Sequence, residues 1–340
     1  MPKLIAVRIH SSQFPGRVEE QLKSSLRARE LNHKFLYDGH KQTQKWLRLH
    51  EACSPARTDP GCLGIYDDAF RKTAEGWPSP QVHLIGLGCG GGQKDVRLLE
   101  LLVNRGLEVC YTPTDVSAGL ALVAAELAGH LIPPERCRPL VADLLDCPEI
   151  LTLAAEAVPP EMPRLVTFFG MLPNFEPSQT GSILSRLQNG DRLLVSANLA
   201  PGLNYPAGVA RILPQYDNPF MRDWLCSFIT DLGVTSADGD LRFEIAESSE
   251  EIGLKRIVAT FFFTAETRIA TGMDEVIFPA GGCLRLFFSY RHTPKIVQTL
   301  LGRWGIDVAD EWVAPSSEEA VFFCEVNRGV LPSSIRSCSC

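Results

Sequence analysis

From Val82 onward, short apolar segments alternate with stretches whose apolar residues recur at helical spacing, and this alternation allows few folds. Helices separate the strands that we expect, which lie at 82–87, 108–111, 138–141, 165–169 and 192–196. Strands joined by crossover helices form a parallel sheet with helices on its faces. The sequence therefore predicts an α/β fold built on a Rossmann-like sheet.

The alternation stops after Gly202 and resumes near Thr293, and the sequence between these points is mostly β-rich. The simplest architecture is one α/β sheet that is interrupted by an inserted α+β segment. We expect a sheet domain from residues 62–200 plus 290–330, a second domain from 1–61 plus 201–289, and a flexible tail at 331–340.

Charge and composition exclude several classes of protein. The net charge is −7 and no run of Lys or Arg exceeds two, whereas binding to a nucleic-acid backbone needs clustered cations. No apolar run approaches the roughly 18–20 residues that span a bilayer, and no signal peptide is recognisable. The eleven cysteines form no CxxC pair. We therefore expect a cytoplasmic, monomeric protein without nucleic-acid, membrane or metal partners.

The turn after the first predicted strand is rich in glycine and includes Gly86, Gly88 and Gly90. Glycines at a strand-to-helix turn let backbone N–H groups approach a ligand closely, and the start of the helix favours negative charge. Asp115, at the end of the second strand, suits a carboxylate that accepts hydrogen bonds from ribose hydroxyls. Asp143, followed by Leu144, ends the third strand, where an adenine amino group and an apolar ring wall would be needed.

Two cofactor classes fit such a turn. From Gly86 to Gly91 the sequence matches the Gly-x-Gly-x-x-Gly pattern of nicotinamide dinucleotide sites, although so glycine-rich a match is weak. The additional Asp143, and a sheet that ends in helix, strand, loop and strand, favour S-adenosylmethionine (SAM).

The chain also resembles a known family, the SAM-dependent histidine-specific Nα-methyltransferases of ergothioneine synthesis. The similar fragments occur in the family's order; they are 34–38, 51–57, 112–117, 168–174, 215–218 and 284–289. The resemblance implies that the sheet domain binds SAM and the second domain binds an amino-acid substrate. It also implies roles for individual residues: Gly88, Lys94, Asp115 and Asp143 in the cofactor pocket, Tyr37 as the catalytic residue, and Gly170, Asn174 and Tyr216 at the substrate.

This chain departs from the family at the substrate side chain. Where the family binds imidazole with a Glu and a Ser two residues apart, this sequence has Phe287 and Ser289. Loss of a hydrogen bond to a charged partner costs about 1.5–3 kcal/mol. The family's Tyr-Tyr-Pro also becomes Cys53-Ser54-Pro55. We therefore expect an acceptor other than histidine, with an aromatic or apolar side chain that packs on Phe287.

The sequence leaves alternatives open. The chain could methylate another small specialised metabolite through a thiol, a carboxylate or an amine. It could be a catalytically silent homologue that binds SAM or S-adenosylhomocysteine (SAH), or a dehydrogenase.

Overall fold

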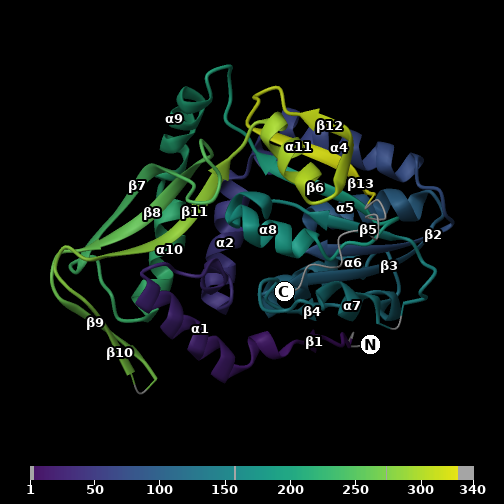
Figure 1. Ribbon diagram of the computed structural model, residues 1–340. Helices are drawn as coiled ribbons and strands as arrows, with labels where there is room; N and C mark the ends of the chain where they lie inside the picture. Colours follow the sequence, from purple (N-terminus) through teal and green to yellow (C-terminus); the bar gives the residue numbers. More distant parts are fainter. Residues whose placement is uncertain (1–3, 157, 273, 328–340) are drawn as a thin grey trace, which may run out of the picture.

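The computed structural model describes residues 4–156, 158–272 and 274–327, and at its centre lies an eight-stranded sheet (Figure 1). The strand order is β1-β4-β3-β2-β5-β6-β13-β12. Strands β1 to β6 pair in parallel, whereas β13 and β12 are antiparallel. The α/β sheet predicted from the alternation is confirmed. Its strands are β1 (Arg8–Ile9), β2 (Gln81–Leu87), β3 (Glu108–Asp115), β4 (Leu140–Val141), β5 (Arg164–Phe168), β6 (Arg192–Asn198), β12 (Ile306–Val313) and β13 (Glu319–Val326).

Helices cover both faces of this sheet and bury its apolar side chains in two separate clusters. One face carries α4 (Pro60–Glu75), α5 (Gln93–Asn104) and α6 (Ala118–Ala128). The other face carries α7 (Ile150–Ala155), α8 (Pro177–Leu184) and α11 (Pro294–Arg303). Because both faces are buried, the central strands are mostly apolar, which is typical of parallel sheets.

The inserted segment forms a second, three-stranded antiparallel sheet in the order β11-β8-β7. Its strands are β7 (Gly239–Glu247), β8 (Lys255–Phe263) and β11 (Cys283–Arg291), close to the β-rich stretches that the sequence predicts at 241–248, 256–264 and 284–289. Two features were not predicted, the hairpin of β9 (Thr267–Thr271) and β10 (Asp274–Phe278) and the helix α9 (Tyr205–Tyr216).

Helix α9 forms although it contains Pro206, Gly208 and Pro214, residue types that disfavour a helix interior. The side chain of Asn204 caps the helix by accepting a hydrogen bond from the N–H of Ala207. Pro206 lies in the first turn, where its missing N–H costs nothing. Helix α10 (Pro219–Asp231) follows directly, and its start is capped by Asn218 in the same way.

The N-terminal segment contacts both sheets. Strand β1 pairs with β4 at the edge of the large sheet. The segments that follow are α1 (Pro15–Ala28), the 3-10 turn η2 (His33–Leu36), α2 (His40–Cys53) and the short α3 (Pro55–Thr58). Leu26 and Leu36 are buried with Trp224 and Phe261 in the core of the second sheet. Figure 1 shows α2 between the two sheets.

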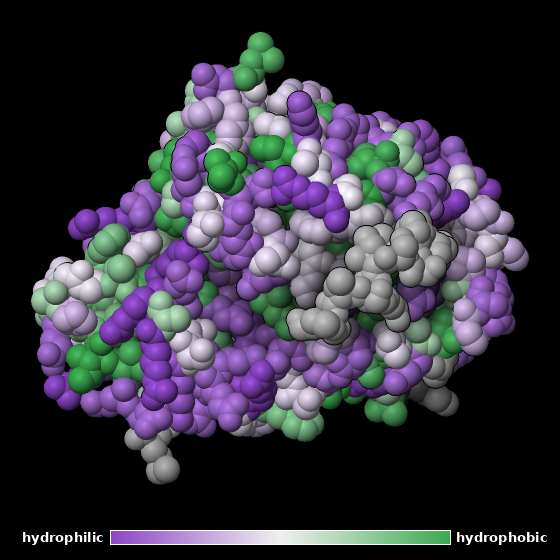
Figure 2. All heavy atoms as spheres, viewed as in Figure 1, coloured by the Kyte–Doolittle hydropathy of each residue, from purple (hydrophilic) through white to green (hydrophobic). Residues whose placement is uncertain are grey.

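On the face seen in Figure 2, hydrophobic side chains lie in small separate groups among hydrophilic ones. Such scattering is ordinary on a protein surface, and the large apolar clusters of this protein lie inside it. Within residues 4–327, apart from the two undescribed positions, no helix has the length and apolarity needed to cross a bilayer.

Candidate active site

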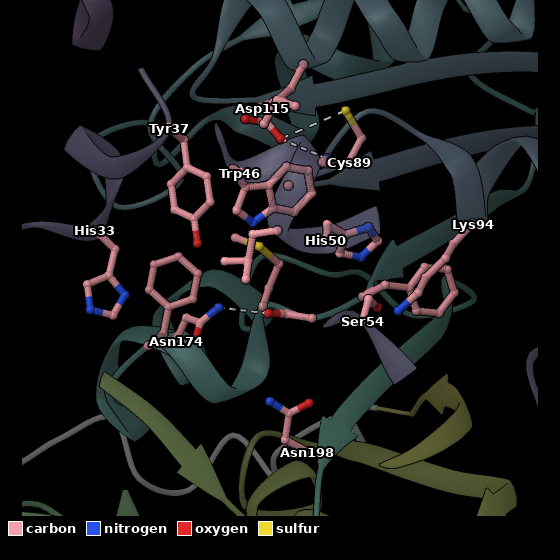
Figure 3. A pocket seen from close by; sticks show the side chains of 18 of the residues that line it. His33, Tyr37, Trp46, His50, Ser54, Cys89, Lys94, Asp115, Asn174 and Asn198 are labelled. Atoms are coloured by element: carbon pink, nitrogen blue, oxygen red, sulfur yellow. Dashed lines mark hydrogen bonds between the residues drawn. The ribbon is translucent and has the colours of Figure 1, made fainter. Parts of the chain in front are cut away.

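A cavity of about 360 Å³ lies at the carboxyl ends of the parallel strands. Its walls come from the loops after β2, β3, β4 and β5, from η2 and α2, and from the ends of α9 and β11. This volume is in the range of roughly 300–1,000 Å³ that is usual for small-molecule sites. The carboxyl edge of a parallel sheet is also where α/β proteins bind their ligands. Figure 3 shows many of the side chains that line the cavity.

The glycine-rich turn after β2 forms one wall. Gly88 and Gly90 both have positive φ angles, +66° and +57°, which side chains with a Cβ rarely adopt. The N–H of Gly90 donates a hydrogen bond of 2.9 Å to Oδ2 of Asp115. The turn and the end of β3 are therefore joined directly, as the predicted cofactor pocket requires.

Asp115 connects the sheet to the N-terminal segment. Its Oδ1 accepts a hydrogen bond of 2.9 Å from the N–H of Ser117. The Ser117 hydroxyl lies 2.8 Å from the hydroxyl of Thr43, which donates in turn to the backbone oxygen of Tyr37. Burial raises the pKa of Asp115 to about 6, and the N–H donors of Ser117 and Gly90 oppose that rise.

Asp143 forms a buried ion pair with Lys34, whose Nζ lies 3.5 Å from Oδ2 of the carboxylate. Lys34 also donates to the side chain of Gln21. The N–H of Leu145 donates to Oδ1 of Asp143, whereas Oδ2 accepts no hydrogen bond from any described residue. A buried carboxylate oxygen without a donor, next to Leu144 in the cavity wall, fits the amino group of an adenine ring.

Lys94, at the start of α5, forms another side of the cavity. Its Nζ donates to the hydroxyl of Tyr66 at 2.6 Å and lies 3.5 Å from Oε1 of Glu319. Glu319 also accepts hydrogen bonds from Tyr66 and from the thiol of Cys62. The charge of Lys94 is thus held in place by α4 and β13.

Tyr37 and Asn174 face each other across the cavity (Figure 3). The hydroxyl of Tyr37 forms no hydrogen bond with any described side chain or backbone atom, and burial, followed by the charge of Asp115, raises its pKa. Asn174 donates from Nδ2 to the backbone oxygen of Gly170 at 3.0 Å. Gly170 has a φ of +70°, and its Cβ position is open. Hydrogen-bonding capacity therefore remains free on both Tyr37 and Asn174.

A polar cluster lines the cavity where β6, α9 and β11 meet. The hydroxyl of Tyr216 donates to Oγ of Ser289 at 2.9 Å and accepts from Nη2 of Arg291 at 2.7 Å. Asn198 donates from Nδ2 to the same Ser289 oxygen at 3.3 Å. We call Asn198, Tyr216, Ser289 and Arg291 the polar cluster.

The profile of one protein family, described as histidine-specific methyltransferase, SAM-dependent, matches residues 17–326. The chain belongs to this family. It is therefore a SAM-dependent methyltransferase, and its sheet, with β13 inserted antiparallel between β6 and β12, is the Rossmann-like class I methyltransferase sheet that we expected. The dehydrogenase alternative is set aside.

Among curated proteins, no sequence matches this methyltransferase significantly. Solved structures with a similar fold include magnesium protoporphyrin IX methyltransferase from Synechocystis PCC 6803 with bound SAH. It is 11% identical, with a TM-score of 0.46, and the match covers 86% of this chain and 98% of that one. Another is the Burkholderia thailandensis 1,6-didemethyltoxoflavin-N1-methyltransferase, at 11% identity and a TM-score of 0.43, covering 84% of this chain and 87% of that one. Because these identities and TM-scores are low, the assignment of the chain as a SAM-dependent methyltransferase rests on the family match alone.

The cavity brings together most of the residues that the sequence predicts for the site of this methyltransferase. Those that line it are Tyr37, Gly88, Gly90, Lys94, Asp115, Asp143, Leu144, Gly170, Asn174 and Tyr216. The remaining three, Gly86, Phe287 and Ser289, lie behind the residues of the wall.

Phe287 is buried and does not face the cavity, so the expectation that a substrate side chain packs on it needs correction. The ring of His33 covers it, stacked at 5.0 Å between centroids, and Trp224 packs against it at 5.7 Å. His33 and Tyr216, which both line the cavity, lie between Phe287 and the cavity, with the Tyr216 ring 6.4 Å from that of Phe287. A substrate would therefore contact His33, and Phe287 would act by supporting that ring.

Gly86 and Ser289 also have positions other than those predicted. A Cβ on Gly86 would lie 2.1 Å from Oδ2 of Asp95, so this glycine makes room for a buried carboxyl rather than for a ligand. Asp95 accepts hydrogen bonds from Tyr111 and Thr167 beneath the glycine turn. Ser289 reaches the cavity only through Tyr216 and Asn198.

Four residues that line the cavity were not predicted as site residues: His33, Lys34, Asn198 and Arg291. For two of them, the sequence pattern could have indicated a place in the site. Asn198 follows the predicted strand 192–196 by two residues, and Arg291 lies two residues beyond Ser289 and hence on the same face of a strand. Lys34 and His33 had no such pattern, because their partners Asp143 and Phe287 lie far away in the sequence.

Proposed function

We propose that this methyltransferase methylates the α-amino group of an amino acid, or of a close derivative, other than histidine. The observation that carries the proposal is the free hydrogen-bonding capacity of Tyr37 and Asn174, which face each other in a cavity of a SAM-dependent enzyme. A neutral hydroxyl and a neutral amide suit the polar groups of an amino acid, because they bind without adding an unpaired charge. In this proposal 1–61 plus 201–289 form the substrate-binding domain.

The cofactor would lie along the carboxyl edge of the sheet. Asp115 would accept hydrogen bonds from the ribose, Asp143 Oδ2 would accept from the adenine amino group, and Lys94 would lie beside the rest of the molecule. When bound, SAM supplies an electrophilic methyl group on a positively charged sulfur. The protein then has to present a neutral amine in line with that methyl group, and such positioning alone can contribute about 7 kcal/mol or more.

Tyr37 is suited to orienting the amine rather than to removing its proton. Its raised pKa keeps the hydroxyl protonated, so it is no general base at neutral pH. Its oxygen can accept a hydrogen bond from the amine N–H, which points the nitrogen lone pair away from Tyr37. Asn174 Nδ2 has a second hydrogen for the substrate, since only one is used by Gly170.

The surroundings of His33 argue against histidine as the acceptor. Burial, followed by the charges of Arg285 and Arg256, lowers the pKa of His33 to about 3. Phe287, stacked behind this imidazole, stands where the family has the Glu that binds a substrate imidazole. Met171, Phe175 and Met221 contribute apolar wall to the same cavity. An aromatic or aliphatic side chain fits these walls better.

The test is a methyl-transfer assay of the purified protein with SAM and each of the common amino acids. SAH formation would report turnover, and mass spectrometry of the product would count methyl groups. We expect an amino acid with an apolar or aromatic side chain to be methylated at nitrogen, and histidine to be a poor substrate. Efficient histidine methylation would contradict the choice of side chain.

Two other outcomes would contradict more of the proposal. Turnover only with amines or hydroxyl compounds that are not amino acids would indicate another specialised metabolite. SAH binding without turnover on any acceptor would indicate a silent homologue.

A further inference from the structure

Arg291 is a buried cation in the cavity wall that lacks an acidic partner. Among the described residues, three Lys or Arg side chains are classed as buried: Lys34, Arg256 and Arg291. Lys34 pairs with Asp143, and Arg256 pairs with Glu176. Arg291 is 7% exposed, yet it forms no ion pair with any described residue.

The contacts of Arg291 are all with neutral groups. Nη2 donates to the hydroxyl of Tyr216 at 2.7 Å, and Nη1 donates to the backbone oxygen of Leu199 at 3.3 Å. Its guanidinium carbon lies 5.3 Å from the centre of the Tyr216 ring, and Nε has no described partner. Glu318, the acidic residue on the adjoining loop, bonds to Gln215 instead. A guanidinium has five N–H donors, so most of this group's capacity remains free.

Within the polar cluster, Arg291 is the charged donor, and it has more free N–H groups than the neutral amide of Asn198. The Tyr216 hydroxyl donates its single proton to Ser289 and accepts from Arg291. Asn198 also donates to Ser289. Tyr216 in this arrangement orients the guanidinium and has no proton left for a ligand. Arg291 lines the cavity on the strand face shared with Ser289. Because Nε is buried, a bound molecule would contact the remaining N–H groups of Nη1 and Nη2.

We propose that Arg291 binds a carboxylate of the acceptor substrate. A buried, unpaired charge is costly, and a carboxylate that accepts two parallel hydrogen bonds from a guanidinium removes most of that cost. The assignment rests on the proposed function and sharpens it: the carboxylate held at Arg291 anchors the substrate, and Tyr216 positions the guanidinium.

SAM also has a carboxylate, and this group is the alternative ligand for Arg291. Lys94, on the helix that follows the glycine turn, and Lys34, beside Asp143, are the cations near the predicted cofactor residues, whereas Arg291 belongs to the second sheet. We therefore assign Arg291 to the acceptor, and binding of SAH separates the two sources. Arg291→Gln should leave SAH affinity within about twofold of the wild type. A loss of tenfold or more would overturn the assignment in favour of the cofactor.

The main experiment compares matched ligands on the SAH-loaded protein. L-phenylalanine, its amide, phenylacetate and phenethylamine, with the corresponding leucine series, would be titrated by calorimetry. In the wild type we expect the carboxylate compounds to bind at least tenfold more tightly than the amide and the amine, because a hydrogen-bonded charge pair is lost in the latter. Arg291→Gln should remove that preference. Equal affinity for carboxylates and their amides in the wild type would overturn the proposal, and this comparison needs no variant.

Stability distinguishes a ligand-binding arginine from a structural one. Removal of a buried charge that has no partner should leave the melting temperature of the free protein unchanged or higher. Arg256→Gln is the matched control, since it leaves Glu176 without its ion pair and should lower the melting temperature. A similar drop for Arg291→Gln would show a structural role and would contradict the proposal.

Failure of this inference and failure of the proposed function give different results. If carboxylates bind through Arg291 but no amino acid is methylated, the proposed function fails and the anion site remains. If an amino acid is methylated equally well by the wild type and by Arg291→Gln, the anion site is wrong and the proposed function remains.

Discussion

Replacement of Asp115 by asparagine should weaken cofactor binding and remove its pH dependence. Asp115 is 5% exposed, and both of its oxygens accept backbone hydrogen bonds, from Gly90 and Ser117. Burial raises its pKa from 3.8 to about 6. An asparagine keeps the shape of the side chain but offers one acceptor oxygen in place of two.

The size of the expected loss in affinity follows from the negative charge of the Asp115 carboxylate. A hydrogen bond from a ribose hydroxyl to a carboxylate contributes about 1.5–3 kcal/mol, so Asp115→Asn should weaken SAH binding by roughly 10- to 100-fold at pH 7.5. In the wild type, binding to the ionised carboxylate competes with the proton. Affinity should therefore be constant above about pH 6 and fall about tenfold for each unit below it.

The stability of the free protein should respond in the opposite direction. The folded state holds the Asp115 proton more tightly than the unfolded state, whose pKa is near 3.8. This group therefore lowers the stability of the free protein as the pH rises from about 4 to about 6. Cofactor binding and stability of the free protein should thus have opposite slopes in that window.

Calorimetric titration with SAH between pH 5 and pH 7.5 is the assay. Asp95 is the control, because burial raises its pKa to about 6 as well, while its oxygens bond to Tyr111 and Thr167. Asp95→Asn should retain the pH dependence that Asp115→Asn loses. Wild-type affinity that does not change over this range, or unchanged SAH affinity in Asp115→Asn, would refute the assignment of Asp115 to the cofactor.

Three further predictions concern the turn and the cavity wall. Gly92→Ala should cost about 2–5 kcal/mol by denaturant unfolding, because a positive φ costs ~1–2 kcal/mol and its Cβ would lie 2.6 Å from that of Ala124. Gly106→Ala has a similar φ but open space around the Cβ, so it should show only the cost of the positive φ. Equal losses of unfolding free energy in the two variants would contradict the clash at Gly92. Tyr37→Phe should leave stability within about 0.5 kcal/mol but slow methyl transfer roughly tenfold, so unchanged turnover would exclude Tyr37 from the site. Phe287→Glu should lower the free energy of unfolding by about 3 kcal/mol or more, since it buries an unpaired charge, and a stable variant that binds histidine would show that this position faces the cavity.

Sequence patterns alone are enough to place the large sheet and to bring the residues predicted to bind the cofactor to one edge of it. The alternation of apolar strands and helices has one simple solution, a parallel sheet, and the carboxyl ends of its strands lie along one edge. Gly88, Asp115 and Asp143 each follow a different predicted strand, so the pattern itself puts all three at that edge. The bond from Gly90 to Asp115 agrees with that reasoning.

The acceptor side of the cavity, in contrast, depends on contacts between distant segments. Periodicity in β11 tells which residues share a face, but whether that face meets a ligand or another side chain depends on segments far away in the chain. His33, from the N-terminal segment, covers Phe287, and no acidic group from any described segment reaches Arg291. Burial and pairing of charge are properties of three-dimensional distance, which local sequence patterns do not contain.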